Sequence, residues 1–380
     1  MRIVYCIDSI RYIGGIQRVT VVKANALAEI PGNEIFILVA DNQSGQIQTR
    51  PSDKVHFMDL GVNYYDDDWK GRLHVLHGIL VKRLMHRKLL KKALRQIQPD
   101  VVIGVGQSEK NFLPLIKGRW KTVREFHFAR NYRTALAKSS FDRILAHCGD
   151  WADKHLSLRK YDCIVTLTEE DRELNWQDMA KVNVVPNPSF FVCEKTSSLD
   201  SHVIISVGRL NYQKNFGSLI KAFGIVHKAH PDWRLRIVGE GDERAVLEKK
   251  VKELNLSECV ELPGYSEDVR EELLNASIFV LTSRIEGFCL AIVEAMECGL
   301  PVVSYACHCG PRDIITDGKD GFLVATGDEV SLARKINQLI EDDGLRIRTG
   351  HHAKENAARY HADAIARRWM SLFKNLVANK

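Results

Sequence analysis

The chain has 380 residues, of which 45% are hydrophobic and 27% are charged, and its formal net charge at pH 7 is +6. This balance is typical of a globular protein long enough for two domains, so it excludes a disordered or fibrous chain. The first residues, "MRIVYCIDSI", lack the features of a secretory signal, and no run approaches the ~20 apolar residues of a membrane helix. We therefore expect a cytoplasmic protein.

Short apolar runs alternate with segments of helical length along almost the whole chain. In the first half the expected strands are "RIVYCID", "EIFILVA", "VHFMDL", "VVIGVG", "KTVREFH", "CIVTLT" and "VNVVPN". In the second half they are "VIISVGR", "RLRIVGE", "CVELPG", "IFVLTS", "PVVSY" and "GFLVA". Such alternation indicates parallel sheets with helical crossovers. The predicted fold is α/β, with two tandem Rossmann-like doubly wound domains facing a central cleft.

The boundary between these domains is expected at Pro186, Asn187 and Pro188. Proline cannot continue a strand ladder, and the polar stretch "CEKTSSLDSH" follows shortly afterwards. One domain would then end at residue 188 and the other would begin at residue 189.

Positive charge is concentrated in the first half of the chain. Residues 1–190 hold 29 basic against 21 acidic residues, a net charge of +8, whereas the remaining residues hold 25 against 27. The densest part is residues 82–97, "KRLMHRKLLKKALRQI", where basic side chains accompany Leu84, Leu90, Leu94 and Ile97, with Leu80 just before, at helical spacing. A basic amphipathic helix of this kind can lie on an anionic membrane surface, but a solvated helix packed on the sheet explains the pattern equally well.

Two glutamates stand in the segment "RIEGFCLAIVEAMECG", which follows the expected strand "IFVLTS". A helix beginning near Cys289 would be apolar nearly all round and buried, so the carboxylate of Glu294 needs a hydrogen-bonding partner. The free N–H groups at the helix start, from Gly287, Phe288 and Cys289, favour an anion such as phosphate. Hydroxyls of a sugar or ribose could then donate to Glu286 and Glu294. Alternatively, Glu286 caps the helix and Glu294 meets an Arg or Lys in the core.

A second segment, "VGRLNYQKNFGSLIKAF", begins at the end of the second domain's first expected strand. Gly208 permits a close turn there. Arg209 and Lys214 can both direct cations into the cleft, and Asn215 is the expected N-cap of the next helix. Two cations beside a helix start predict a diphosphate site, with surface salt bridges as the weaker interpretation.

Together these segments resemble those of the retaining glycosyltransferases of family 4, which have the GT-B fold. "GRLNYQKN" resembles the family's phosphate-binding segment, "EGFCLAIVEAMECGLPVV" its pair of glutamates, and "GPRDIITDGKDGFLV" its carboxyl-proximal glycine-rich segment. "IGGIQRVT" is similar to the glycine loop of members that build bacterial surface polysaccharides. The resemblance covers essentially the whole chain. It implies that residues 1–188 bind the acceptor, that residues 189–360 bind the donor, and that a helix at 361–380 crosses back to the first domain.

The resemblance also implies roles for the residues of the donor site. Glu294 would bind the ribose hydroxyls of the nucleotide, and Glu286 would contact the donor sugar. The amides of Phe288, Cys289 and Leu290 would bind the distal phosphate. The family usually has Gly where Cys289 stands, and this departure is expected to affect which sugar fits, as is Asp313 in a place where Glu is usual.

Further roles concern the reacting groups. By the same resemblance, Arg209 and Lys214 would neutralise the leaving diphosphate, and Gly15 would let the first domain's loop close over it. His127, which follows the expected strand "KTVREFH", matches the family's histidine near the anomeric centre. The expected catalytic groups are therefore His127, Glu286, Arg209 and Lys214.

The implied reaction is a retaining hexosyl transfer from a nucleotide-diphosphate sugar, with UDP slightly favoured over GDP and no metal ion. The cations and amides would stabilise the negative charge that grows on the leaving diphosphate. The expected acceptor is a glycan or lipid-linked glycan of cell-surface polysaccharide synthesis, with peripheral contact to the anionic inner membrane face. No nucleic-acid partner is expected.

Other functions fit the sequence less completely. A catalytically inactive nucleotide-sugar-binding subunit or sensor would share every donor-site residue, so this alternative stays open. Metal chemistry would have to use Asp66, Asp67 and Asp68, which stand in a polar segment far from the phosphate-binding segments. A zinc site at "CHCG" would lack a second ligand pair, and a dehydrogenase would need a Gly-x-Gly-x-x-Gly turn after the first strand.

Overall fold

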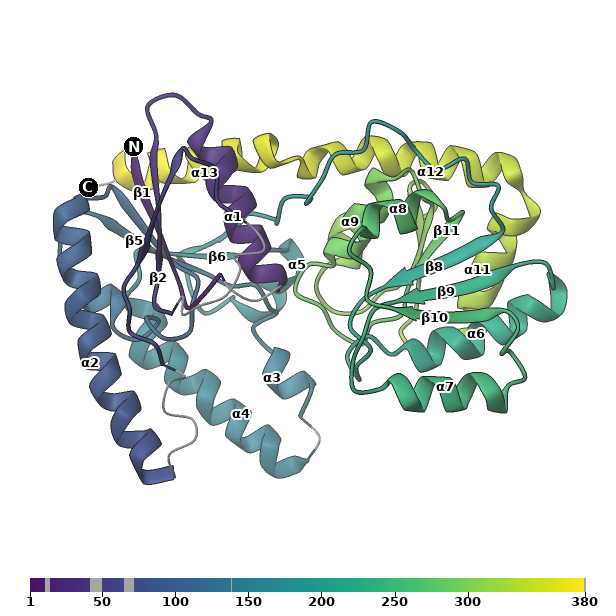
Figure 1. Cartoon of the computed structure of the whole chain (residues 1–380), viewed down its shortest axis with the longest axis horizontal. Helices are drawn as coiled ribbons and strands as arrows, with labels where there is room; N and C mark the ends of the chain where they lie inside the picture. Colours follow the sequence, from purple (N-terminus) through teal and green to yellow (C-terminus); the bar gives the residue numbers. More distant parts are fainter. Residues whose placement is uncertain (11–13, 42–49, 65–71, 138, 379–380) are drawn as a thin grey trace. The chain divides into compact units, whose positions relative to one another are not determined.

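The structure is a computed structural model that describes residues 1–10, 14–41, 50–64, 72–137 and 139–378, with the backbone alone for residues 72–79. The chain divides into two compact units (Figure 1). The N-terminal unit comprises Met1–Leu167, Asn175–Phe190 and Ala362–Lys380, and the C-terminal unit comprises Thr168–Leu174 and Phe191–His361. The unit boundaries expected from the sequence are at residues 188 and 360. The sequence gives no sign that the short segment Thr168–Leu174 groups with the C-terminal unit.

The described part of the N-terminal unit contains a seven-stranded parallel sheet with the order β3-β2-β1-β4-β5-β6-β7. Its strands are β1 (Arg2–Ile7), β2 (Glu34–Val39), β3 (Val55–Asp59), β4 (Val101–Gly104), β5 (Lys121–Glu125), β6 (Cys163–Thr166) and β7 (Val182–Val184). Its α-helices, among the described residues, are α1 (Gly15–Ala28), α2 (Arg72–Ile97), α3 (Tyr132–Ala135), α4 (Ser140–Ala152) and α13 (Ala362–Ala378), and α5 (Glu169–Asn175) follows β6. Each strand lies within a run that the sequence predicts.

Both faces of this sheet are covered by helices. Ile3 and Tyr5 of β1 belong to a buried cluster with side chains of α1 and α13, whereas Val4 belongs to a cluster with α2. Alternate residues of one strand therefore enter different cores, which is why the strands read as continuous apolar runs rather than as an alternating pattern.

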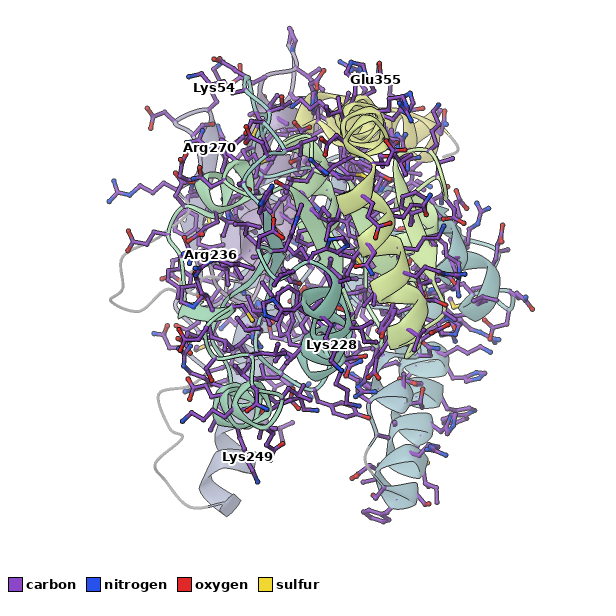
Figure 2. The ribbon with its side chains drawn as sticks, turned by 90° about the vertical axis from the view of Figure 1, so that its right-hand side faces the viewer. Lys54, Lys228, Arg236, Lys249, Arg270 and Glu355 are labelled. Carbon is purple, nitrogen blue, oxygen red and sulfur yellow. The ribbon has the colours of Figure 1, made fainter. Side chains whose placement is uncertain are left out.

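The C-terminal unit contains a six-stranded parallel sheet with the order β10-β9-β8-β11-β12-β13. Its strands are β8 (Val203–Val207), β9 (Arg234–Val238), β10 (Val260–Gly264), β11 (Ile278–Leu281), β12 (Val302–Tyr305) and β13 (Gly321–Val324). Its helices include α6 (Phe216–Ala229), α7 (Arg244–Glu253), α8 (Val269–Leu274), α9 (Leu290–Glu297), α10 (Pro311–Ile314), α11 (Glu329–Glu341) and α12 (Asp343–Ala357). Charged side chains such as Lys228, Lys249 and Glu355 extend from the outer surface of this unit (Figure 2). The predicted fold of two doubly wound α/β domains is confirmed.

The strand order reverses once in each sheet, and this reversal decides where ligands can bind. β1 lies between β2 and β4, and β8 lies between β9 and β11. In the second sheet Ile278 of β11 pairs with Ile204 of β8. The loops that leave two such neighbouring strands go to opposite faces of the sheet and leave a crevice between them. The β8–α6 and β11–α9 loops therefore flank the natural ligand site of the C-terminal unit.

Helix α2 packs against the sheet along only part of its length. Leu90, Leu94 and Ile97 are buried against the sheet, but Leu80 and Leu84 are 61% and 63% exposed. The first turns of the helix extend past the strands of their own unit, so no sheet covers these leucines (Figure 1). Packing on the sheet therefore holds for Leu90, Leu94 and Ile97, and the alternative of membrane contact stays open for the exposed leucines.

Helix α4 is a second amphipathic helix whose apolar side is exposed. The exposed apolar side chains of α4 and the turn after it are Phe141, Ile144, Leu145, Trp151 and Leu156. No helix in the described part of the chain combines the length and hydropathy needed to cross a bilayer.

Candidate active site

The β8–α6 and β11–α9 loops of the C-terminal unit are joined by hydrogen bonds. The Arg284 backbone N–H donates to the Gln213 carbonyl at 2.8 Å. The Arg284 guanidinium donates to Oδ1 of Asn215 at 2.8 Å and lies over the Tyr212 ring at 4.4 Å. Asn215 stands at the N-cap position of α6, as predicted, but its side chain makes no capping hydrogen bond and accepts from Arg284 instead. These contacts fix the two loops as one surface.

The central contact on this surface is an ion pair between Lys214 and Glu286. Nζ of Lys214 lies 2.6 Å from Oε1 of Glu286, and the two side chains are only 18% and 8% exposed. Gln213 donates to the other carboxylate oxygen of Glu286 at 3.5 Å. Burial lowers the pKa of Lys214, but the neighbouring negative charge, led by Glu286, outweighs this and holds the pKa above its ordinary value. The ammonium therefore stays charged, and Glu286 bonds to Lys214 rather than capping the next helix.

Helix α9 begins directly beyond this pair. Its N-cap residue is Cys289, with φ 73° and ψ 58°, in the left-handed region that favours glycine. Phe288 and Cys289 are both 4% exposed. The family's usual glycine at this position is thus explained by the backbone, and the cysteine here adopts the same kind of turn at a cost of about 1–2 kcal/mol.

Gly310 packs against the turn that precedes α9. Gly310 has φ 131°, and a Cβ atom there would stand 2.5 Å from the Phe288 carbonyl oxygen. The β12–α10 loop also pairs with the β11–α9 loop, because the Glu286 N–H donates to the His308 carbonyl at 3.0 Å. The turn before α9 is therefore packed from both sides and is held in place.

The remaining predicted donor-site residues lie on the same loops and helix. Glu294 is in the second turn of α9 and is 7% exposed, among fully buried apolar neighbours. Arg209 follows β8 and is exposed, and within the described residues its guanidinium has no ion pair or hydrogen bond. A Cβ atom at Gly208 would stand 3.1 Å from Cε of Lys214, so the glycine gives this lysine room to fold back over its own loop.

Asp313 makes hydrogen bonds to the start of α5 that the sequence does not predict. Its carboxylate accepts from the backbone N–H of Glu169 at 2.6 Å and of Glu170 at 3.4 Å. It therefore holds the start of α5, and its expected effect on which sugar fits stays a prediction.

The two predicted site residues of the first half lie in the N-terminal unit. His127 follows β5, is 4% exposed, and has its Nε2 at 3.5 Å from Oε1 of Glu125. Burial lowers the pKa of His127 to about 4, although the charge of Glu125 opposes this. The imidazole is therefore neutral at pH 7. Gly15 is the exposed first residue of α1, and no atom lies within 4 Å of the Cβ it could carry.

The charged residues that lie close to His127 were not predicted from the sequence. Glu125 forms a fully buried ion pair with Lys23 of α1, and Lys23 also lies 5.3 Å from the centre of the Trp369 ring. A signal existed, because Lys23 stands in the largely apolar segment "TVVKANALA", and Arg124 and Glu125 stand between the apolar Val123 and Phe126. A charge in such a segment needs a partner, but the sequence cannot say which one.

The metal-binding alternatives gain no support. Asp66, Asp67 and Asp68 lie outside the described residues. Cys307 and Cys309 are buried, while His308 lies 3.8 Å from a carboxylate oxygen of Glu170. Across the described ranges, no three His, Cys, Asp or Glu side chains are grouped in a way that could hold a metal ion.

The chain is similar in sequence and in fold to known glycosyltransferases. Residues 194–358 match the family model of glycosyl transferases group 1. An uncharacterized glycosyltransferase of Haemophilus influenzae is 28% identical over 378 residues, 98% of this chain and 99% of that protein. The amylovoran biosynthesis glycosyltransferase AmsD of Erwinia amylovora is 34% identical over 215 residues, 54% of this chain and 60% of AmsD. The structure of Anabaena HepE in complex with UDP-glucose matches with a TM-score of 0.71 and 19% identity over 99% of this chain and 100% of that one.

The fold and the matched segment together support a glycosyltransferase with the GT-B fold. Its C-terminal unit carries the segment that matches the glycosyl transferases group 1 family, and the Lys214–Glu286 pair and the start of α9 both lie inside that segment.

Proposed function

We propose that this protein is a retaining hexosyltransferase that uses a nucleotide-diphosphate sugar, with UDP slightly favoured over GDP. Its acceptor is a glycan or lipid-linked glycan of cell-surface polysaccharide synthesis. The observation that carries the proposal is the largely buried Lys214–Glu286 pair beside the start of α9. The name of AmsD supports the polysaccharide pathway, and the UDP-glucose bound to HepE supports the donor.

The donor site acts by stabilising the leaving group. Breaking the bond between sugar and phosphate puts negative charge on the diphosphate, and groups aimed at that charge lower the barrier because it grows on the way to the transition state. Arg209 supplies a guanidinium with no competing partner among the described residues, and Lys214 supplies an ammonium. The amides of Phe288, Cys289 and Leu290 supply donors at a helix N-terminus.

In this proposal Glu286 pairs with Lys214 in the free protein and contacts the donor sugar in the bound state. Without a ligand it neutralises and positions Lys214. When the diphosphate contacts Lys214, the carboxylate of Glu286 is left beside the donor sugar, where it accepts from sugar hydroxyls. Glu294 binds the ribose hydroxyls, which gives its buried carboxylate a hydrogen-bonding role in the bound state.

His127 and Gly15 act from the N-terminal unit. The neutral imidazole of His127 can hydrogen-bond a hydroxyl near the anomeric carbon, and Gly15 leaves open space at the start of α1. The incoming hydroxyl attacks from the face that the phosphate leaves, and the leaving phosphate takes its proton. No metal ion is needed for these steps, since the positive charge comes from side chains.

We also propose peripheral contact with the anionic inner face of the membrane. Residues 72–97 of α2 contain no acidic residue, and Leu80 and Leu84 of this helix are exposed. The apolar stripe of α4 is exposed as well, on the same unit. Apolar side chains beside a basic helix are what an anionic bilayer surface binds.

The experiment that tests the enzymatic proposal compares donors and then measures turnover. UDP and GDP are screened for thermal stabilisation of the protein, because a ligand that binds the native state raises its melting temperature. UDP-sugars and GDP-sugars are then assayed for release of the nucleoside diphosphate with and without acceptor. Binding of UDP without turnover of any donor would instead support the inactive subunit or sensor.

A further inference from the structure

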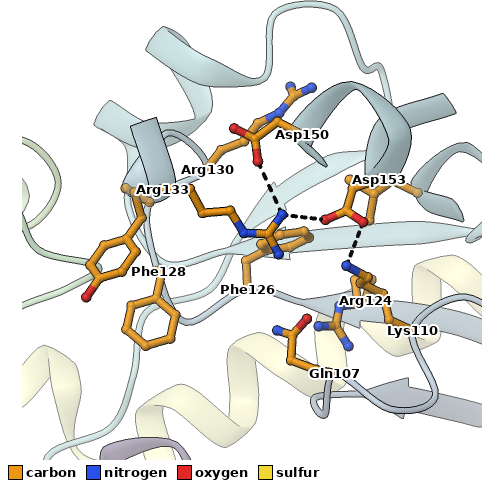
Figure 3. A pocket seen from close by; sticks show the side chains of 12 residues that line it. Gln107, Lys110, Arg124, Phe126, Phe128, Arg130, Arg133, Asp150 and Asp153 are labelled. Carbon is orange, nitrogen blue, oxygen red and sulfur yellow. Dashed lines mark hydrogen bonds and ion pairs between the residues drawn. The ribbon is translucent and has the colours of Figure 1, made fainter. Parts of the chain in front are cut away.

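The N-terminal unit contains a cavity of about 100 Å³ at the end of β5 (Figure 3). Phe126 and Phe128, the two chain neighbours of His127, both line it. The other walls come from the loop after β4, from α3 and from the end of α4. The cavity therefore opens from the carboxyl edge of the sheet, where the strands of a doubly wound domain present ligands.

Positive charge dominates the lining of this cavity. Four of its side chains are cationic: Lys110, Arg124, Arg130 and Arg133. Two are carboxylates: Asp150 and Asp153. The carboxylates fix two of the cations in place, because Asp153 lies 2.6 Å from Lys110 and 3.2 Å from Arg133 (Figure 3).

Arg124 is the least compensated of these cations. Its side chain is 2% exposed, and its Nε has no hydrogen-bond partner within the described residues. Its carboxylate neighbour is Glu109, at 3.6 Å. Burial, reinforced by the charge of Asp8, raises the pKa of Glu109 to about 8, so this carboxyl is mostly protonated at neutral pH. A buried guanidinium without a full counter-charge is costly, and an anion in the cavity would relieve that cost.

The aromatic residues define a second part of the site. Phe128 and Tyr132 line the cavity with ring centres 4.8 Å apart, and Phe128 is 44% exposed. Exposed rings of this kind pack against the apolar face of a sugar ring or a polyol chain. The volume is well below the ~300–1,000 Å³ of a site for a whole drug-sized ligand, so it fits one compact anionic group and a part of what carries it.

We propose that this cavity binds a phosphate ester of the glycosyl acceptor, with the attached sugar or polyol against Phe128 and Tyr132. The assignment of the ligand as the acceptor rests on the proposed function, whereas the binding of a phosphate ester does not. Arginine side chains form paired hydrogen bonds with phosphate oxygens, which suits the three guanidinium groups around the cavity. His127 itself does not line the cavity, although its chain neighbours Phe126 and Phe128 do.

The first experiment measures binding without turnover. N-acetylglucosamine 1-phosphate and N-acetylglucosamine are titrated calorimetrically into the full chain in the presence of saturating UDP, which occupies the donor loops. The phosphate ester is expected to bind at least tenfold more tightly than the uncharged sugar, because each charged hydrogen bond contributes about one order of magnitude. Equal affinities for the two probes would overturn the proposal.

Matched variants locate the site. Arg133→Gln, which removes a cation whose side chain is 49% exposed, should weaken binding of the phosphate ester about tenfold. Arg159→Gln changes an exposed arginine of the same unit outside the cavity lining and should leave binding unchanged. Arg124→Gln should weaken binding at least as much if it folds, and Arg133→Gln carries the test if it does not. An Arg133→Gln variant that binds as tightly as Arg159→Gln would contradict the assignment.

A transfer assay distinguishes the sources of the phosphate. A farnesyl-diphosphate-linked sugar represents a lipid-linked acceptor, and a glycerol phosphate oligomer represents a polyol phosphate polymer. Whichever accepts the sugar should lose transfer in Arg133→Gln, and transfer that is unchanged in this variant would overturn the acceptor assignment. UDP binding, measured in the same variants, should be unchanged, so a failure of the proposed donor site is seen separately from a failure of this cavity.

Discussion

Nζ of Lys214 lies 2.6 Å from Oε1 of Glu286, although 72 residues separate them in the chain. The contact joins the two loops that leave the neighbouring strands β8 and β11 at the reversal of the strand order. A cation and an anion that are held together beside a helix start can separate when a diphosphate arrives. In the proposed donor site, the diphosphate would take the place of Glu286 as the partner of Lys214.

Replacing Lys214 by Met should reduce kcat/KM about 100- to 1,000-fold, since it removes one preorganised donor to the leaving group. It should also lower the free energy of unfolding by about 1–3 kcal/mol, because the carboxylate of Glu286 stays half-buried without its cation. Steady-state kinetics and urea unfolding measure the two effects. The matched control is Lys221→Met, whose ion pair with Glu329 is on the surface with Lys221 51% exposed. Equal kinetic loss in both variants would argue against the role of Lys214.

Replacing Glu286 by Ala should abolish transfer but leave UDP binding intact, because Glu286 is proposed to contact the sugar and not the nucleotide. Thermal stabilisation by UDP and release of UDP from the donor sugar measure these two properties. If the variant loses UDP binding together with transfer, Glu286 acts only by holding the loop.

Cys289→Gly and Cys289→Val should have opposite outcomes. Glycine adopts a φ of 73° without strain, so the variant should keep its activity and change the unfolding free energy by no more than about 1 kcal/mol. Valine is β-branched and should destabilise the turn by at least about 1–2 kcal/mol and weaken UDP binding. Thermal unfolding with and without UDP checks both. A stable valine variant with normal UDP affinity would show that this turn does not shape the phosphate site.

Acid should destabilise the protein partly through His127. Its pKa is about 4 in the folded state, below the ~6.5 of an unfolded chain, so the unfolded state binds more protons between these values. Stability therefore falls as the pH drops from about 6.5 towards 4, by as much as about 3 kcal/mol from this residue.

His127→Asn should remove this part of the pH dependence. His86, whose pKa burial also lowers to about 4, remains in the variant and preserves a similar contribution. Urea unfolding of both proteins at a series of pH values between 4 and 7 gives the difference. Identical slopes for the two proteins would mean that His127 is not held neutral in the fold.

The double variant Phe141→Ser/Ile144→Ser should weaken binding to vesicles of anionic phospholipid by at least about tenfold, since both side chains are exposed on α4 and contribute apolar area. Co-sedimentation with vesicles measures the effect, and binding of the unchanged protein should fall as salt is added because α2 contributes by charge. Val246→Ser, on the exposed face of α7 and 59% exposed, is the control. A wild-type chain that stays in solution with such vesicles would rule out this contact.

Much of the fold could be predicted from local sequence patterns. Every strand of both sheets lies within a predicted run. Inner strands such as β4 and β11 are apolar throughout because helices cover both faces, whereas the edge strands β3 and β10 carry exposed polar residues. The glycines and cations that follow β8 and β11 in the sequence predict a phosphate site, and the structure joins these two loops by hydrogen bonds. The start of α9 at Leu290 agrees with the expected start near Cys289.

Other features required the tertiary structure, because they depend on which distant segments meet. The sequence shows Lys23, Glu125 and His127 but not that α1 places the lysine against the carboxylate. The repeat of leucines along α2 predicts an apolar face but not where the sheet beneath it ends, and the sequence therefore cannot show that Leu80 and Leu84 are exposed.

The sequence alone therefore determined the elements of this protein and the chemistry available at the end of each strand, since both follow from residues that are close together in the chain. The tertiary structure decided which charges became partners and which apolar side chains stayed exposed. The order of the strands brings Lys214 to Glu286, and the packing of α3 and α4 on the first sheet gathers Lys110, Arg124 and Arg133 around one cavity. Long-range packing fixes such pairings, and no local pattern encodes them.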